Sequence, residues 1–144
     1  MLSNLDSKEY CVLGDKIGEE TGKVTGQRVL ATEGPPTVET SFQASGSLYG
    51  VNHTTIGTYQ AKMRPDGSLF GEGQGVVMTA DGGHGTWKGS GIGKFGPGGS
   101  VSYRGAIYYQ TTTSSLQRLS EVAAVFEYDV DGDGNTVGRL WEWK

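Results

Sequence analysis

Polar and apolar residues alternate with a period of two along most of the chain, in runs of about ten residues. Successive side chains of a strand point to opposite faces of a sheet, so this alternation is typical of strands with one buried face. Clusters of Gly, Pro, Asp and Asn, such as Pro65-Asp66-Gly67, separate the runs and indicate turns. The pattern predicts strands near residues 9–14, 22–32, 37–49, 54–64, 68–79, 86–95, 100–112, 121–130 and 136–143, the first being short or merged with the second.

Long strands joined by short links favour one all-β domain over residues 1–144, an antiparallel up-and-down β-barrel of about eight strands. A closed barrel leaves no strand edge exposed. The alternative, a β-sandwich, has exposed edge strands. Residues 113–121 are the only helix candidate. Within them Leu116 and Leu119 are three positions apart, a spacing that places both on one helical face and allows them to cover one end of the barrel.

Alternation also assigns each strand an inward face. Four tyrosines fall on the apolar faces of their strands and are expected to line the interior: Tyr59, Tyr103, Tyr109 and Tyr128. Glycine recurs at every second position of two strands, as Gly71, Gly73 and Gly75 and as Gly89, Gly91 and Gly93. Such glycines leave room for large groups opposite them, or let the strand coil sharply.

The strand at 68–79 can face either way. The bulky residues Phe70, Val76 and Met78 share a face with Glu72 and Gln74. If this face is inward, the Glu72 carboxylate lies in the interior, where it needs a cationic partner or a raised pKa. The opposite orientation places the three glycines inside and Glu72 in solvent.

The same alternation suggests two cationic partners for an interior Glu72. Arg28 shares a face with Val24 and Leu30, and Arg139 shares a face with Trp141 and other apolar residues. An ion pair between Glu72 and either arginine would be stabilised by a charge-assisted hydrogen bond.

Composition excludes several classes of protein. The chain has 25 Gly and only 4 Pro among 144 residues, with no repeating Gly-X-Y pattern, so it is not collagen. One cysteine, Cys11, excludes a disulfide framework and a cysteine-rich zinc site. The formal charge is −4 without a basic cluster, so no nucleic-acid partner is expected. The N-terminal residues resemble no secretory signal and no long apolar run follows, so a cytoplasmic protein without membrane contact is expected.

Three local patterns that suggest metal or cofactor chemistry have simpler explanations. Residues 129–135 resemble half of a calcium loop, but flanking strands and the Asp-Gly sequence are typical of a hairpin turn. His53 and His84 are predicted in loops at the same barrel end, and exposed loop histidines rarely bind metal. Gly91–Gly96 matches a dinucleotide pattern without the helix that the pattern requires. No metal and no cofactor are therefore expected.

Two glycine-punctuated segments, Gly71–Gly75 and Trp87–Gly93, are followed by Gly105–Thr111. In this pattern, which runs over about residues 37–143, the chain resembles small bacterial proteins of calycin-like or allene-oxide-cyclase-like barrel architecture. The resemblance implies a barrel whose interior binds apolar ligands or directs cyclisations. It transfers no catalytic residue to this sequence.

Three functions follow as alternatives. In the first, the tyrosine-lined interior binds a small apolar or aromatic molecule, and Glu72, Gln74 and an arginine (Arg28 or Arg139) anchor it. In the second, the chain is a cyclase or isomerase in which Glu72 acts as acid or base. In the third, a barrel filled by side chains has a structural or oligomeric role without a ligand. A homo-oligomer is compatible with all three.

Overall fold

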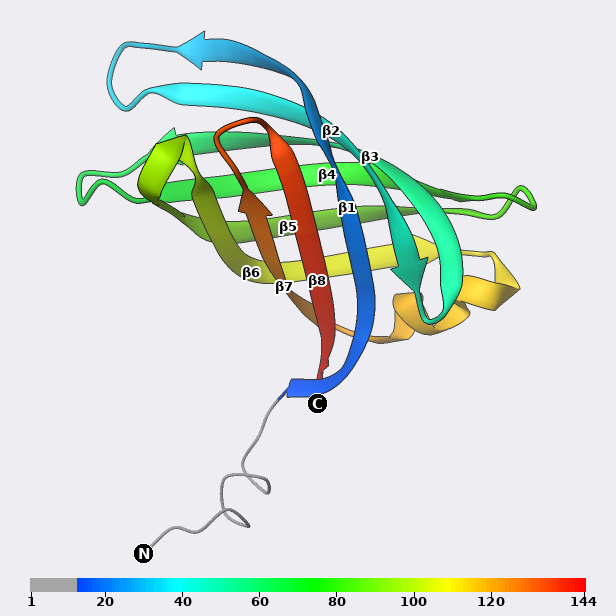
Figure 1. The fold of residues 1–144 in the computed structure, drawn as a ribbon. Helices are drawn as coiled ribbons and strands as arrows, with labels where there is room; N and C mark the ends of the chain where they lie inside the picture. The colour runs from blue at the N-terminus through cyan, green and yellow to red at the C-terminus, as the bar shows by residue number, and fades with distance from the viewer. Residues whose placement is uncertain (1–12) are drawn as a thin grey trace, which may run out of the picture.

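The computed structural model describes residues 13–144 and shows a closed antiparallel barrel (Figure 1). Each strand pairs with the next in sequence, and the last strand pairs with the first, so the blue and red ribbons of Figure 1 lie side by side. The strands are β1 (Leu13–Ala31), β2 (Thr37–Leu48), β3 (Val51–Met63), β4 (Leu69–Thr79), β5 (His84–Phe95), β6 (Val101–Thr111), β7 (Ala124–Val130) and β8 (Asn135–Trp143). The predicted up-and-down barrel is confirmed, and the sandwich is not formed.

The predicted strand at 9–14 lies mostly outside the described residues. Its described end and the predicted strand at 22–32 form one continuous strand, β1, of 19 residues. Such a long strand pairs with β2 along one edge and with β8 along the other, and this double pairing closes the barrel.

One end of the barrel is closed by the 3-10 segment η2 (Ser114–Glu121), which corresponds to the predicted helix candidate. Leu116 and Leu119 of η2 are completely buried and belong to an apolar cluster with Leu48, Val77 and Ile107. The predicted cover is therefore confirmed. A second short segment, η1 (Pro97–Gly99), lies in the β5–β6 connection. In the described part of the chain, no helix has the length and apolar character needed to cross a membrane.

Both glycine triplets face the barrel interior, where aromatic residues lie against the bare backbone of all of them except Gly89. A Cβ atom added at Gly93 would lie 2.6 Å from Cε1 of Tyr103, and one added at Gly73 would lie 2.8 Å from Cβ of Tyr59. A Cβ at Gly75 would collide with the indole of Trp87. The glycines therefore provide the space in which the interior aromatic side chains pack.

The inward orientation considered for Glu72 and Gln74 is wrong. Both side chains are exposed, and Val76 and Met78 on the same face are 44 % and 38 % exposed. The inner face of β4 carries the glycines instead, because aromatic rings from neighbouring strands already occupy the space beside them. Glu72 therefore lies in solvent, outside the barrel.

The inward position predicted for Arg28 is also wrong, because β1 contains a bulge. Val24 pairs with the inward Phe42, and the register shifts between Val24 and Gly26. A one-residue shift moves every later side chain to the other face. Arg28 consequently pairs with Glu39 on the outer face, where Nη2 lies 3.4 Å from Oε1 of Glu39.

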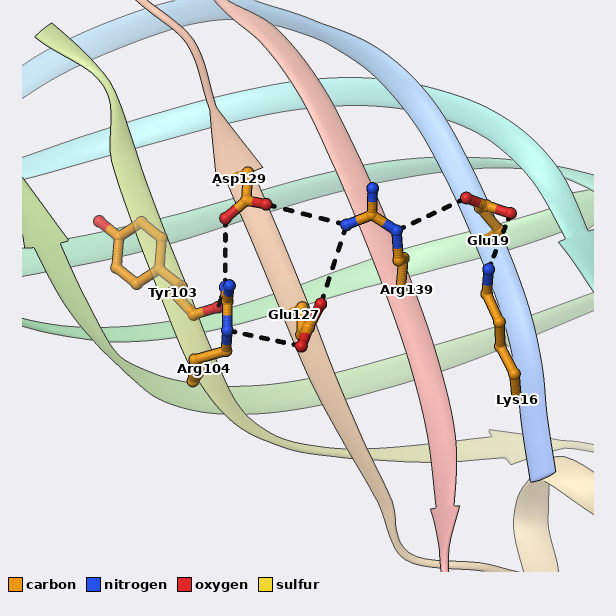
Figure 2. Close-up of polar contacts among 7 residues, drawn as sticks. All are labelled: Lys16, Glu19, Tyr103, Arg104, Glu127, Asp129 and Arg139. Carbon is orange, nitrogen blue, oxygen red and sulfur yellow. Dashed lines mark hydrogen bonds and ion pairs between the residues drawn. The ribbon is translucent and has the colours of Figure 1, made fainter. Parts of the chain in front are cut away.

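Arg139 likewise lies on the outer face, between acidic residues of both neighbouring strands (Figure 2). Its Nε lies 3.6 Å from Glu19 Oε1, and its Nη1 lies 3.8 Å from Glu127 Oε1 and from Asp129 Oδ2. Asp129 also pairs with Arg104 of β6, whose Nη1 lies 3.1 Å from Asp129 Oδ1. Trp141 and its neighbours thus form an outer face, and neither predicted arginine reaches the interior. Exposed pairs of this kind each contribute at most about 1 kcal/mol.

Candidate functional site

A hydrogen bond between two ionisable side chains lies inside the barrel. Nε2 of His53, on β3, lies 2.7 Å from Oε2 of Glu20, on β1. The His53 side chain is completely buried, and that of Glu20 is 15 % exposed. A largely buried carboxylate is costly without a partner, so this contact stabilises Glu20 in the interior.

The strand between them explains how Glu20 and His53 meet. In the sheet register, Gly46 of β2 pairs with Glu20 on one side and with His53 on the other. Because Gly46 has no side chain, the two longer side chains bridge directly over it. A Cβ atom at Gly46 would lie 2.7 Å from the Glu20 Cα, and one at Gly138, on the opposite side, would lie 3.3 Å from the Glu20 Cγ. Glu20 thus sits between two glycines.

Neither residue of this pair was among the predicted site residues. His53 is not in a loop as expected: it lies within β3 with its ring inward, whereas His84 is exposed at the start of β5. The available signal was the alternation of β3, because the inward set that includes Thr55 and Gly57 continues back to His53. For Glu20, the signal was its place between Gly18 and Gly22.

Aromatic rings surround the space next to Glu20. The ring of Tyr128 lies 5.3 Å from that of Phe42 and 5.8 Å from that of Tyr59, measured between centroids. Tyr59 and Tyr103 are 5.6 Å apart, and Phe42 and Trp87 are 6.3 Å apart. Tyr59 meets Tyr128 at 83° and Tyr103 at 71°. These edge-to-face arrangements are favourable for aromatic pairs and direct the ring faces in different directions. We refer to these five rings as the aromatic box.

A cavity of about 80 Å³ lies among the box, Glu20 and further inward residues. It is smaller than the roughly 300 Å³ of a site for a drug-sized ligand. At about 10–15 Å³ for one water, it accommodates roughly five to eight water-sized groups. The predicted tyrosines all border this cavity, namely Tyr59, Tyr103, Tyr109 and Tyr128. Glu127 and Arg139 border it too, but their charged groups pair with each other on the outer face.

The polar atoms of the interior differ in their hydrogen bonding. Trp87 Nε1 donates to Thr55 Oγ1 at 3.1 Å, and Thr55 Oγ1 donates to the carbonyl of Val76 at 3.0 Å. In contrast, the buried Tyr128 hydroxyl and His53 Nδ1 make no hydrogen bond of good geometry among residues 13–144. Unpartnered buried polar atoms are rare in native proteins, so they mark places where a ligand could supply the missing bond.

Burial keeps the phenols of the cavity neutral. It raises the pKa of Tyr103, Tyr109 and Tyr128 well above the ordinary value for tyrosine. The neighbouring phenol of Tyr59 adds to this increase in pKa at Tyr128, and the nearby charge of Glu20 adds to it at Tyr109 and Tyr128. Glu20 is thus the carboxylate that acts electrostatically on Tyr109 and Tyr128.

Comparison with known proteins identifies the fold. No protein-family model and no curated protein sequence matches the chain. A Clostridium acetobutylicum protein with unknown function has a TM-score of 0.77 at 12% identity, over 89% of this chain and 96% of its own. A conserved Rhodopseudomonas palustris protein of unknown function has a TM-score of 0.77 at 13% sequence identity, and the match covers 92% of this chain and 98% of that protein. A β-barrel-like Acinetobacter baumannii protein has a TM-score of 0.77 at 10% sequence identity, and the match covers 92% of this chain and 95% of that protein. At these identities, the similarity establishes that the chain shares their barrel fold.

Proposed function

We propose that the barrel interior binds a small molecule, with Glu20 as the polar anchor in place of the predicted Glu72. The observation that carries this proposal is the cavity itself. It is bordered by aromatic rings and by the carboxylate of Glu20, and the buried hydroxyl of Tyr128, one of its lining residues, makes no hydrogen bond of good geometry within residues 13–144. Mostly apolar cavities with few polar groups are typical of ligand sites.

The size of the cavity limits the ligand. A volume of about 80 Å³ suits a molecule much smaller than a lipid or a steroid. The interior site is the one property taken from the resemblance to calycin-like and allene-oxide-cyclase-like barrels. The cyclase or isomerase alternative depended on Glu72 as acid or base, and that residue lies outside the cavity, so we propose binding alone.

A titration with phenol tests the proposal, because phenol is small and aromatic and can donate a hydrogen bond to Glu20. The readouts are the NMR signal of the Trp87 indole N–H and the melting temperature, which rises when a ligand binds the folded state. We expect a saturable shift in the wild type and weaker binding in Glu20→Gln. Glu72→Gln is the matched control and should bind as the wild type does. The proposal fails if phenol shifts no interior signal, the result expected of a filled structural barrel.

A further inference from the structure

We propose that the preferred ligand of the cavity is a small organic ammonium ion, held by the Glu20 carboxylate and the faces of the aromatic box. This inference rests on the proposed binding function and specifies the ligand class. It depends on the sign of the charge at the cavity and on the kind of surface that surrounds this charge.

No cationic side chain of the described chain neutralises Glu20 from within the cavity. Among residues 13–144, Arg139 is the only lysine or arginine that borders the cavity. Its guanidinium is held on the outer face by Glu19, Glu127 and Asp129 (Figure 2). A cation from outside is therefore the partner that the carboxylate can still accept.

The hydrogen bonding of His53 is best satisfied by a neutral imidazole. In that form Nε2–H donates to Glu20, and the one unsatisfied group of the ring is the acceptor lone pair of the buried Nδ1. A charged imidazolium would instead leave a buried N–H donor at Nδ1 without an acceptor, which is costly. With a neutral His53, the Glu20–His53 pair carries one net negative charge.

The surrounding surface favours a cation over a neutral apolar group. A cation near the face of an aromatic ring is attracted by its negative charge density, and cages of such rings recognise methylated ammonium groups. Within the box, Tyr59 is steeply inclined to both Tyr103 and Tyr128, so the faces of these rings point in different directions. An anion, in contrast, would be repelled by the negative charge density of the ring faces and by the Glu20 carboxylate.

Two probes of similar size and shape test the charge preference. Tetramethylammonium chloride and tert-butanol are titrated into the wild type at equal ionic strength, with the Trp87 indole N–H signal as readout. We expect tetramethylammonium to bind at least about tenfold more tightly than tert-butanol. Glu20→Gln should remove this preference, whereas Glu72→Gln should retain it.

Each other outcome overturns the inference in an identifiable way. If tert-butanol binds as tightly as tetramethylammonium, the cavity is a binding site without a preference for cations, and the proposed function stands. If neither probe nor phenol binds, the proposed function fails as well. If the preference persists in Glu20→Gln, the cation binds elsewhere. Should that variant not fold, the comparison of the two probes in the wild type still decides the question.

Discussion

Glu20 and His53 are hydrogen-bonded at 2.7 Å across the bare backbone of Gly46, although 33 positions separate them in the sequence. They belong to β1 and β3, two strands that do not pair with each other. The bond joins them from inside the barrel and holds the Glu20 carboxylate next to the aromatic box. Stability and ligand binding should therefore depend on the same pair.

Replacing His53 with phenylalanine should destabilise the fold. His53→Phe keeps a planar ring but removes the donor to Glu20, so a buried carboxylate loses its partner. We expect a loss of about 1–3 kcal/mol in the free energy of unfolding, measured by urea denaturation. The exposed His84→Ala is the control and should change it by less than about 0.5 kcal/mol. Equal losses in both variants would show that the interior bond contributes nothing.

The space above Gly57 should be essential for packing. A Cβ atom there would lie 2.6 Å from Cε1 of Phe42 and 2.7 Å from Cζ2 of Trp87. Gly57→Ala should therefore lower the free energy of unfolding by about 1–3 kcal/mol through overpacking. Gly26→Ala is a matched control, since nothing lies within 4 Å of its added Cβ. If the two variants unfold at the same urea concentration, the rings are not held against this glycine.

The hydroxyl of Tyr128 should not contribute to stability. It is buried, and although the phenol of Tyr59 lies close by, no hydrogen bond of good geometry satisfies it within the described chain. Tyr128→Phe removes an unsatisfied polar group, so the free energy of unfolding should stay the same or increase. The same variant should weaken phenol binding if the hydroxyl serves the ligand. A clear loss of stability on thermal unfolding would instead reveal a structural hydrogen bond of this group.

Stability should decrease in alkaline solution. Burial raises the pKa of Tyr103 and Tyr128, and burial together with the hydrogen bond to Glu142 raises that of Tyr49 to about 12. Unfolded tyrosines titrate near pH ~10. Above this pH the unfolded chain releases protons that the folded chain keeps, so the free energy of unfolding falls as pH rises.

Urea denaturation at about pH 9 and pH 11 measures this decrease. Tyr103→Phe should make it smaller, because one phenol with a raised pKa is removed. An equally steep decrease in Tyr103→Phe and in the wild type would show that ionisation of Tyr103 is not linked to unfolding.

Much of the fold was predictable because strand alternation is a local property. The inward tyrosines, the barrel and the cover formed by Leu116 and Leu119 all followed from the spacing of apolar residues. The prediction that Arg28 points inward was wrong for a physical reason that alternation cannot show. A single bulge between Val24 and Gly26 reverses the faces of the strand beyond it.

The candidate site was only half predictable. The aromatic lining was expected, but the anchor was assigned to Glu72 because its strand carries bulky residues on the same face. The structure turns that face outward, since rings from other strands need the bare backbone of Gly71, Gly73 and Gly75. Glu20 and His53 were missed because neither lay in a predicted strand: Glu20 falls between the strands predicted at 9–14 and 22–32, and His53 was predicted in a loop.

By itself, the sequence determined most of the strands and the aromatic character of the interior, because these follow from residue spacing within single strands. The short links between strands indicated the order in which the strands pair. The tertiary structure alone decided which carboxylate lies inside. That choice depends on register between strands, which brings Glu20, Gly46 and His53 into one row. It also depends on the volume of the rings from opposite walls, which leaves space only where glycine faces inward.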